Sequence, residues 1–304
     1  MRRDFGGGLV LRAGGPADVE PLAAFYADFI RFQDQPEPEA RFAVWARDLL
    51  TRHPTLTPAD ALVVEDTRAG VIASAALVVP QTLAIGGVRI AATQPELIAT
   101  RPEYRGRGLV RAMIDVAHER SAARGDALQF IAGIPNFYRQ FGYELAIPRG
   151  GGPHLPLDFA APATSPYRVR PMREDDVAFA ARLDAGAASR YFVTVPRDEA
   201  LWRYELTGHS PGSMVASAYR IVETSEGRPV ATLIHVPCLL GSSLVVGGFE
   251  VAPGVSWRMA WDAALGYLRA TGEEYAAGVV SGPASTRYAC QRSAAPGAQR
   301  NTPA

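Results

Sequence analysis

Two stretches of this sequence, about half the chain apart, repeat the same short pattern. Leu11-Arg12 followed by Asp18-Val19 returns as Val169-Arg170 followed by Asp176-Val177, and each residue lies 158 positions from its counterpart. Each copy predicts a short strand, a turn and an amphipathic helix with acidic residues in its first turn, as the helix dipole favours. A chain of 304 residues is about twice the commonest domain size, so both copies fit. We therefore expect a tandem duplication of one fold.

Composition excludes several classes of protein. Hydrophobic residues make up 48% of the chain and charged residues 20%, which excludes disorder, collagen-like repeats and coiled coil. The formal net charge is +0, so we expect no nucleic-acid partner. All 31 basic residues are arginine, which excludes lysine Schiff-base chemistry. The five His and two Cys are scattered along the chain, so we expect no metal site.

No segment predicts export or membrane insertion. The apolar run that follows the basic N-terminus, residues 9–11, is too short for a signal peptide. The longest apolar-rich stretch, residues 71–79, falls far below the roughly 18 residues of a membrane helix. We expect a cytoplasmic protein with no membrane partner, and the sequence predicts no particular oligomeric state.

Hydrophobic periodicity predicts a similar series of elements in each half of the chain. The first half predicts strands at 9–12, 61–65, 71–79, 88–100, 127–132 and 143–147, and helices at 16–32, 38–52, 109–124 and 136–141. The second half predicts strands at 167–170, 214–222, 230–236, 245–251 and 275–280, and helices at 175–183 and 256–271. Sheet strands followed by a helix and a further strand indicate a mixed α/β architecture.

Two segments without periodicity punctuate the chain. Residues 149–166 hold three consecutive glycines and several prolines, which is typical of a linker. Residues 283–304 are rich in Ser, Ala, Pro, Gln and Arg and predict a disordered tail. The expected domains are therefore 1–148 and 167–282.

Residues 100–110, Thr-Arg-Pro-Glu-Tyr-Arg-Gly-Arg-Gly-Leu-Val, carry the clearest chemical signal. A strand ends there, a loop with Gly106 and Gly108 follows, and an amphipathic helix begins. Unpaired backbone N–H groups at a helix start make such a loop a cradle for phosphate. Arg105 and Arg107 would add charge-assisted contacts to phosphate oxygens. A tight strand-to-helix turn with solvated arginines gives the same pattern and stays open as an alternative.

Two other phosphate-binding motifs fit less well. A P-loop requires a lysine, which this chain lacks. A dinucleotide fingerprint requires a third glycine where Arg111 stands and an acid at the end of the next strand, whereas Asp126 precedes that strand. The dinucleotide interpretation is therefore disfavoured.

Residues 105–110, Arg-Gly-Arg-Gly-Leu-Val, resemble the Arg/Gln-x-x-Gly-x-Gly/Ala pyrophosphate loop of the GNAT superfamily of acyl-CoA-dependent N-acyltransferases. Val110 departs from the small residue that is usual at the last position. Roughly 30 residues further on, residues 136–144, Asn-Phe-Tyr-Arg-Gln-Phe-Gly-Tyr-Glu, resemble the second signature of the family, a short helix ending in Phe-Gly-Tyr. The resemblance covers residues 9–147, and the second half only as a degenerate copy.

The resemblance implies a fold and an activity. The fold is α/β (α+β), with two tandem acyl-CoA N-acyltransferase-like domains, each a mixed, largely antiparallel sheet flanked by helices. The catalytic domain would be 1–148 and the degenerate one 167–282. The implied activity is acetyl-CoA-dependent N-acetyl transfer directly to a primary amine, with acetyl-CoA as co-substrate. Small-molecule and protein amines both stay open as acceptors, and a non-catalytic acyl-CoA-binding or regulatory protein is the competing class.

The resemblance also implies which residues bind acetyl-CoA. In the family, the backbone of the strand before the loop pairs with the pantetheine arm, the loop takes the pyrophosphate, and an asparagine near the second signature contacts the cofactor. The residues at these positions are Leu97, Ile98, Ala99, Thr100, Arg105, Gly106, Arg107, Gly108, Leu109, Val110 and Asn136. In the second half the loop position holds residues 251–257, Val-Ala-Pro-Gly-Val-Ser-Trp, so we expect no productive acetyl-CoA binding there.

Two residues are candidates for proton transfer. Tyr138 matches the tyrosine that, in the family, protonates the departing CoA thiolate, and aromatic packing is its alternative role. Glu96 is a candidate base for the attacking amine, and an ordinary half-exposed strand acid is its alternative. By two-residue alternation Glu96 would share a face with Ile98 and Thr100. Phe141 and Tyr143 are expected in the core.

Overall fold

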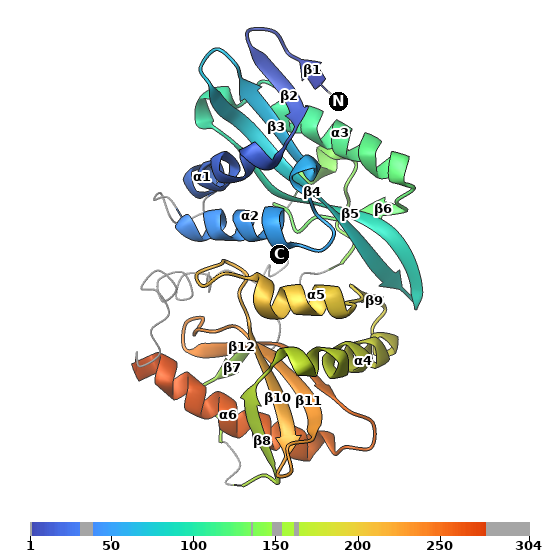
Figure 1. Cartoon of the computed structure of the whole chain (residues 1–304), viewed down its shortest axis with the longest axis vertical. Coiled ribbons are helices and arrows are strands. Elements are labelled where there is room, and N and C mark those ends of the chain that lie inside the picture. Colours follow the sequence, from blue (N-terminus) through green and yellow to red (C-terminus); the bar gives the residue numbers. More distant parts are fainter. Residues whose placement is uncertain (1, 31–38, 135, 148–153, 161–163, 278–304) are drawn as a thin grey trace, which may run out of the picture. The chain divides into compact units, whose positions relative to one another are not determined.

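The computed structural model describes residues 2–30, 39–134, 136–147, 154–160 and 164–277 (Figure 1). The chain forms two compact units. The first comprises Met1–Arg149 and Asp184–Val215, and the second comprises Gly150–Leu183 and Ala216–Ala304. The tail predicted at 283–304 lies outside the described residues. Within the described part of the chain, no helix has both the length and the apolar character needed to cross a membrane.

A largely antiparallel sheet forms the centre of the first unit. Within the described residues its strands run in the order β1-β2-β3-β4-β5-β6, and β9 pairs with β4. Only β5 and β6 pair in parallel; the other neighbours are antiparallel. The strands are β1 (Arg2–Asp4), β2 (Leu9–Ala13), β3 (Ala61–Asp66), β4 (Val71–Ile85), β5 (Val88–Thr100), β6 (Leu128–Gln129) and β9 (Val193–Thr194).

Helices cover both faces of this sheet (Figure 1). Side chains alternate along β4, so Ala75, Leu77 and Val79 pack towards α1 and α2. Ala76 and Val78 pack towards α3 on the opposite face. Because both faces are buried, the strand reads as a continuous apolar run. These helices are α1 (Val19–Phe29), α2 (Ala40–Arg52) and α3 (Leu109–Arg124).

The second unit holds a smaller antiparallel sheet with the strand order β7-β12-β11-β10-β8. Helix α6 packs against the apolar side chains of the central strands. Strand β7 lies within the segment predicted to be a linker, so part of that segment belongs to this sheet. The elements are β7 (His154–Pro156), β8 (Tyr167–Pro171), the part of α4 (Val177–Ala187) up to Leu183, β10 (Ala218–Thr224), β11 (Pro229–His235), β12 (Ser243–Val251) and α6 (Trp257–Ala277).

One hydrogen-bonded network occurs in both units. In the first, Arg12 donates from Nη1 and Nη2 to Asp18 at 2.8 and 2.7 Å, and from Nε to Glu65 at 2.8 Å. The second unit repeats these bonds at 2.6, 2.8 and 2.6 Å, between Arg170, Asp176 and Glu223. Each network ties one strand, β2 or β8, to the start of the following helix and to the neighbouring strand, β3 or β10. Glu65 and Glu223 are also 158 residues apart, the same separation as the Arg and Asp pairs of the sequence repeat.

Residues 184–215, which we expected in the second domain, pack with the first unit. Ser210 donates from its backbone N and from Oγ to Asp48 of α2, both at 2.7 Å. The backbone N of Gly86, in the β4–β5 turn, donates to Phe192 O at 2.7 Å. This segment contains α5 (Glu199–Arg203) and a short π-helix, Tyr204–Gly208.

Three predicted strands differ in the structure. The strand predicted at 127–132 is reduced to β6, and residues 143–147 form no strand. Beyond β6 the chain diverges from β5, so an apolar alternation there has no neighbouring strand to pair with. The strand predicted at 275–280 is wrong over 275–277, which continue α6, and residues 278–280 lie outside the described part.

Candidate active site

The loop between β5 and α3 has the geometry of an anion cradle. Gly106 and Gly108 have φ of 73° and 74°, a left-handed conformation that side chains disfavour. The backbone N of Ala112 donates to Gly108 O at 3.0 Å. The N–H groups of residues 109–111 therefore precede the helical ladder and lie at the positive end of the helix dipole. This arrangement suits a phosphate or diphosphate group.

The two loop arginines take different positions. Arg105 lines the cavity in front of the loop and donates from Nε to Thr100 O at 3.4 Å. Arg107 turns towards Tyr104, with its guanidinium 5.1 Å from the ring centroid, and donates to Glu103 O at 3.0 Å. Arg105 is thus the loop arginine that faces the cavity, whereas Arg107 contacts residues of the loop itself.

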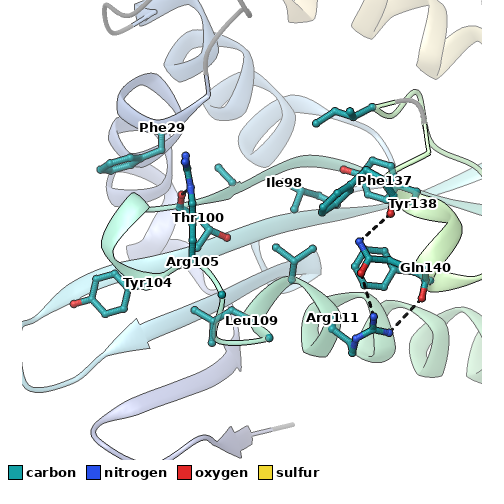
Figure 2. A pocket seen from close by; sticks show the side chains of 16 residues that line it. Phe29, Ile98, Thr100, Tyr104, Arg105, Leu109, Arg111, Phe137, Tyr138 and Gln140 are labelled. Atoms are coloured by element: carbon teal, nitrogen blue, oxygen red, sulfur yellow. Dashed lines mark hydrogen bonds between the residues drawn. The ribbon is translucent and has the colours of Figure 1, made fainter.

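A cavity of ≈ 590 Å³ extends from this loop to the second signature (Figure 2). Figure 2 shows Thr100 and Arg105 towards one end of it, and Phe137 and Tyr138 towards the other. We call this space the loop cavity. The predicted residues that line it are Ile98, Ala99, Thr100, Arg105, Gly106, Gly108, Leu109, Val110 and Tyr138.

Other lining residues were not predicted from the sequence. They are Phe29, Tyr104, Arg111, Ile134, Phe137, Gln140 and Phe141. Arg111 donates from Nη2 to Gln140 Oε1 at 3.2 Å and stacks on Phe141, 4.9 Å from the ring centroid. This contact joins the start of α3 to the short 3-10 helix Tyr138–Phe141. The prediction that Phe141 belongs to the core is therefore wrong. The position of Phe141 in the sequence, shortly after the loop motif, was the signal that could have placed it at this cavity.

Strands β5 and β6 separate beside this cavity. They pair only through Ala92 with Leu128 and Thr93 with Gln129, and Phe130 N donates to Thr93 O at 3.0 Å. From residue 94 to residue 100, no strand of the described part of the chain pairs with β5 on that side. Its backbone amide groups there are available to pair with an extended, amide-containing ligand.

A β-bulge in β5 overturns the predicted placement of Glu96. Leu97 has φ of 49°, and the register with β4 shifts there, so that Leu77 opposes Glu96 while Ala75 opposes Ala99. Directly opposed residues share a face, and Leu77 packs towards α1 and α2. Glu96 therefore lies on the face of Ala99 and not on the face of Ile98, because the extra residue breaks the alternation.

The bulge also fixes the surroundings of Glu96. Its Oε2 accepts from Gln94 Nε2 at 2.7 Å, and its Oε1 accepts from the backbone N of Leu97 at 3.2 Å. The Leu97 side chain is buried in the core beside α1 and α2, so only its backbone can serve a ligand. Glu96 itself is half-buried, near the start of the part of β5, residues 94–100, that does not pair with β6.

Tyr138 is half-buried in an aromatic group. Its ring lies 5.0 Å from Phe137 and 6.0 Å from Tyr143, centroid to centroid. Its hydroxyl makes no hydrogen bond to another described residue, whereas the Tyr143 hydroxyl donates to Gln129 Oε1. Burial, together with the negative charge of Glu96, raises the pKa of Tyr138 to about 12. The hydroxyl stays protonated at neutral pH and is free to donate.

Asn136 lies outside the loop cavity. Its φ is 65°, and it lines a second, larger cavity that Tyr138 also borders. The structure therefore brings Tyr138 together with the loop, and leaves Glu96, Leu97, Arg107 and Asn136 outside the lining of the loop cavity.

Comparison with known proteins identifies the class of the first unit. Residues 18–146 match the model of the acetyltransferase (GNAT) domain. This region of the chain is therefore a GNAT domain. No curated protein sequence matches the chain.

Solved structures share the fold. A conserved protein of unknown function from Enterococcus faecalis, described as a probable N-acyltransferase, aligns over 87% of this chain and 63% of its own, with 17% identity and a TM-score of 0.60. A GCN5-related N-acetyltransferase from Anabaena variabilis gives the same coverage and TM-score at 13% identity. N-myristoyltransferase of Saccharomyces cerevisiae with bound myristoyl-CoA aligns over 91% of this chain and 76% of its own, with 10% identity and a TM-score of 0.63. The chain spans less than two thirds of the first two proteins.

Proposed function

We propose that the first unit is an N-acetyltransferase that transfers an acetyl group from acetyl-CoA directly to a primary amine. The observation that carries this proposal is the loop cavity. It joins the cradle at the start of α3 to the hydroxyl of Tyr138, which makes no hydrogen bond to another residue that the structure describes. The GNAT domain match supports acyl transfer as the class of reaction.

The residues present fit acetyl-CoA. The N–H groups of residues 109–111 and the guanidinium of Arg105 would hold the diphosphate. The open edge of β5 offers amide groups to the two amides of pantetheine, and Ile98 offers an apolar contact. When bound, acetyl-CoA supplies the acyl group as a thioester.

Tyr138 acts as the proton donor to the leaving sulfur. Its pKa of about 12 keeps the hydroxyl protonated. A thiol ordinarily has a pKa of about 8.5, and burial at the same place raises that pKa too. The difference between the pKa values of the tyrosine and the thiol is therefore smaller than it would be in water. The absence of another hydrogen bond from the hydroxyl to the described residues leaves its proton for this step.

Glu96 acts as the base. The acceptor nitrogen forms a bond to the acyl carbon and the carbon–sulfur bond breaks. One proton leaves the nitrogen for Glu96, directly or through water, and one proton passes from Tyr138 to sulfur. Proton transfer from Glu96 to Tyr138 restores both residues. The carboxylate charge raises the pKa of the Tyr138 hydroxyl, so the two groups are in electrostatic reach of one another.

The second unit has no such role in our proposal. Residues 252–256 connect β12 to α6 and are fewer than residues 101–108 of the first unit. Pro253 lacks an N–H, and the N–H of Val255 already donates to Ala252 O at 3.1 Å. Fewer free donors face a ligand there, so we propose that the second unit does not bind acetyl-CoA productively.

The test compares two tyrosine variants. Tyr138→Phe should lower kcat by about 100-fold, because it removes a general acid, and should leave the Kd of acetyl-CoA within about threefold of the parent. Tyr191→Phe changes an exposed tyrosine outside both cavities and should leave kcat unchanged. Release of free thiol gives kcat and calorimetric titration gives Kd. Equal kcat for Tyr138→Phe and the parent would remove Tyr138 from the mechanism.

A further inference from the structure

A second cavity of ≈ 1230 Å³ adjoins the loop cavity in the first unit. The two cavities share Ile134, Tyr138 and Phe141 in their linings. Its other walls come from the second half of α3, from β6, from residues 131–134 and 136–147, and from the end of β4 with residues 192–193 beside it. A molecule in this cavity therefore lies against the same tyrosine that we assign as the general acid.

The charges that line this second cavity are paired. Asp126 accepts from Ser121 Oγ and Arg124 Nη2, both at 2.9 Å, and from the Thr93 hydroxyl. Although burial acts to raise it, the hydrogen bonds from Thr93, Arg124 and Ser121 hold the pKa of Asp126 below its ordinary value. Asp126 is thus ionised but satisfied by its neighbours.

The second carboxylate of the lining is also compensated. Glu144 lies 3.2 Å from Arg139 Nε. Each of the two carboxylates among the described lining residues therefore already has an arginine partner. A ligand with several ammonium groups would lose hydration in this cavity and would have to compete with these arginines for the carboxylates.

Large apolar side chains of the lining are exposed to solvent in the free protein. Leu145 is 73% exposed, Phe192 is 75% exposed and Ile134 is 62% exposed. An apolar surface of this kind beside polar groups is typical of a ligand groove. Covering it with the body of a ligand gains roughly 25 cal/mol per Å² of apolar surface removed from water.

We propose that this second cavity binds the acyl acceptor and selects a monoamine on an apolar body, such as an arylalkyl amine, over a polyamine. The inference rests on the proposed function, because Tyr138 gives the cavity its link to the acyl group. The amino group lies at the end bordered by Tyr138, and the apolar body lies along Ile134, Leu145 and Phe192.

The experiment compares two primary amines of similar reach. With saturating acetyl-CoA, 2-phenylethylamine should show a kcat/KM at least about tenfold above that of 1,4-diaminobutane, because the ring buries apolar surface that a dication cannot. An equal or higher kcat/KM for the diamine, with acetyl-CoA binding intact, would overturn the inference and leave the proposed function standing. Absence of acetyl-CoA binding would instead contradict the proposed function, and this inference with it.

A matched pair of variants locates the binding site. Phe192→Asp places a charge on the cavity wall and should raise the KM for 2-phenylethylamine by about tenfold, with the Kd of acetyl-CoA unchanged. Val88→Asp changes another exposed apolar residue, at the start of β5, that does not line the cavity, and should change neither constant. If Phe192→Asp weakens the binding of hexanoyl-CoA and leaves the KM of the amine unchanged, the cavity holds an acyl chain and the inference is wrong.

Discussion

Gly133 controls where the Tyr138 ring can lie. A Cβ atom built on Gly133 would overlap two ring carbons of Tyr138. Phe137, Phe141 and Tyr143 pack beside the ring, so a displaced ring would move into one of the two cavities that it lines. A position that only glycine can occupy therefore holds the proposed acid in place.

We predict that Gly133→Ala lowers kcat by about tenfold or more, because a displaced acid no longer meets the leaving sulfur. Gly186→Ala is the matched control. Its added Cβ meets no atom within 4 Å, and in helix α4 the change should stabilise the fold by about 0.5 to 1 kcal/mol. Steady-state kinetics and thermal unfolding of both variants check this. Parent-like kcat in Gly133→Ala would show that the ring position does not matter.

Sequence reasoning at the residue scale depended on regular geometry. Residues of the loop motif could be assigned because a glycine pattern and a helix start determine the backbone of that loop. The face of Glu96 could not be assigned, because a bulge at Leu97 inserts an extra residue that no alternation rule contains. Phe141 was misplaced because residues 136–147 follow tertiary contacts rather than a regular periodicity.

At the scale of the element, the start of α3 is the part most sensitive to charge. We predict that Gly108→Asp raises the Kd of acetyl-CoA at least about tenfold, because a carboxylate would stand where the helix dipole and Arg105 attract an anion. Gly125→Asp is the matched control, because Gly125 ends the same helix with the same φ of 74° and lies outside both cavities.

Both variants carry the same backbone strain, about 1 kcal/mol, and Gly125→Asp also places a carboxylate at the negative end of the helix dipole. The melting temperature should therefore fall at least as far in the control as in Gly108→Asp. Calorimetric titration then separates strain from charge. An equal Kd for Gly108→Asp and Gly125→Asp would mean that the α3 start does not bind the diphosphate.

Elements with strong periodicity were predicted well. The strand at 88–100 and the helix at 109–124 are confirmed with the same bounds as β5 and α3. The strand predicted at 143–147 is wrong: Leu145 and Ile147 are exposed, although their alternation resembles that of a strand. A strand needs a partner edge as well as a pattern, and the separation of β5 from β6 removes that edge.

At the scale of the whole molecule, the repeated Arg-Asp-Glu network supports our proposal that the two units arose from one duplicated fold. Arg12 and Arg170 hold equivalent strands, helix starts and neighbouring strands. The sequence repeat contained the Arg and Asp positions, but Glu65 and Glu223 became apparent only from the contacts. The packing of residues 184–215 with the first unit could not be predicted, since it depends on long-range contacts such as Ser210 with Asp48.

Stability of the second unit should depend on pH through His235. This residue is fully buried in β11, with Nε2 3.0 Å from Tyr267 Oη and Nδ1 2.9 Å from Val236 O. The Tyr267 hydroxyl accepts from Arg220 Nε at 2.6 Å, so it donates to His235 Nε2, and the imidazole is neutral. Burial, with the nearby charge of Arg220, lowers the pKa of His235 to about 4.

The folded pKa lies below the unfolded value near 6.5, so the unfolded chain binds more protons between these limits. We predict that His235 contributes no penalty above pH 6.5 and that its contribution lowers the free energy of unfolding progressively from pH 6.5 to 4, by about 3 kcal/mol in all. Proton NMR of the imidazole checks this directly. A midpoint for His235 near 6.5, the ordinary value for a solvated histidine, would contradict the assignment.

Calorimetric titration of the purified protein with acetyl-CoA, followed by measurement of free thiol with pooled primary amines, tests the central claim most directly. We predict saturable binding that Gly108→Asp weakens, and thiol release that depends on amine and is lost in Tyr138→Phe. Binding without release across the pool would favour a non-catalytic acyl-CoA-binding protein. Absence of saturable binding would contradict the assignment of residues 105–110 as the diphosphate loop.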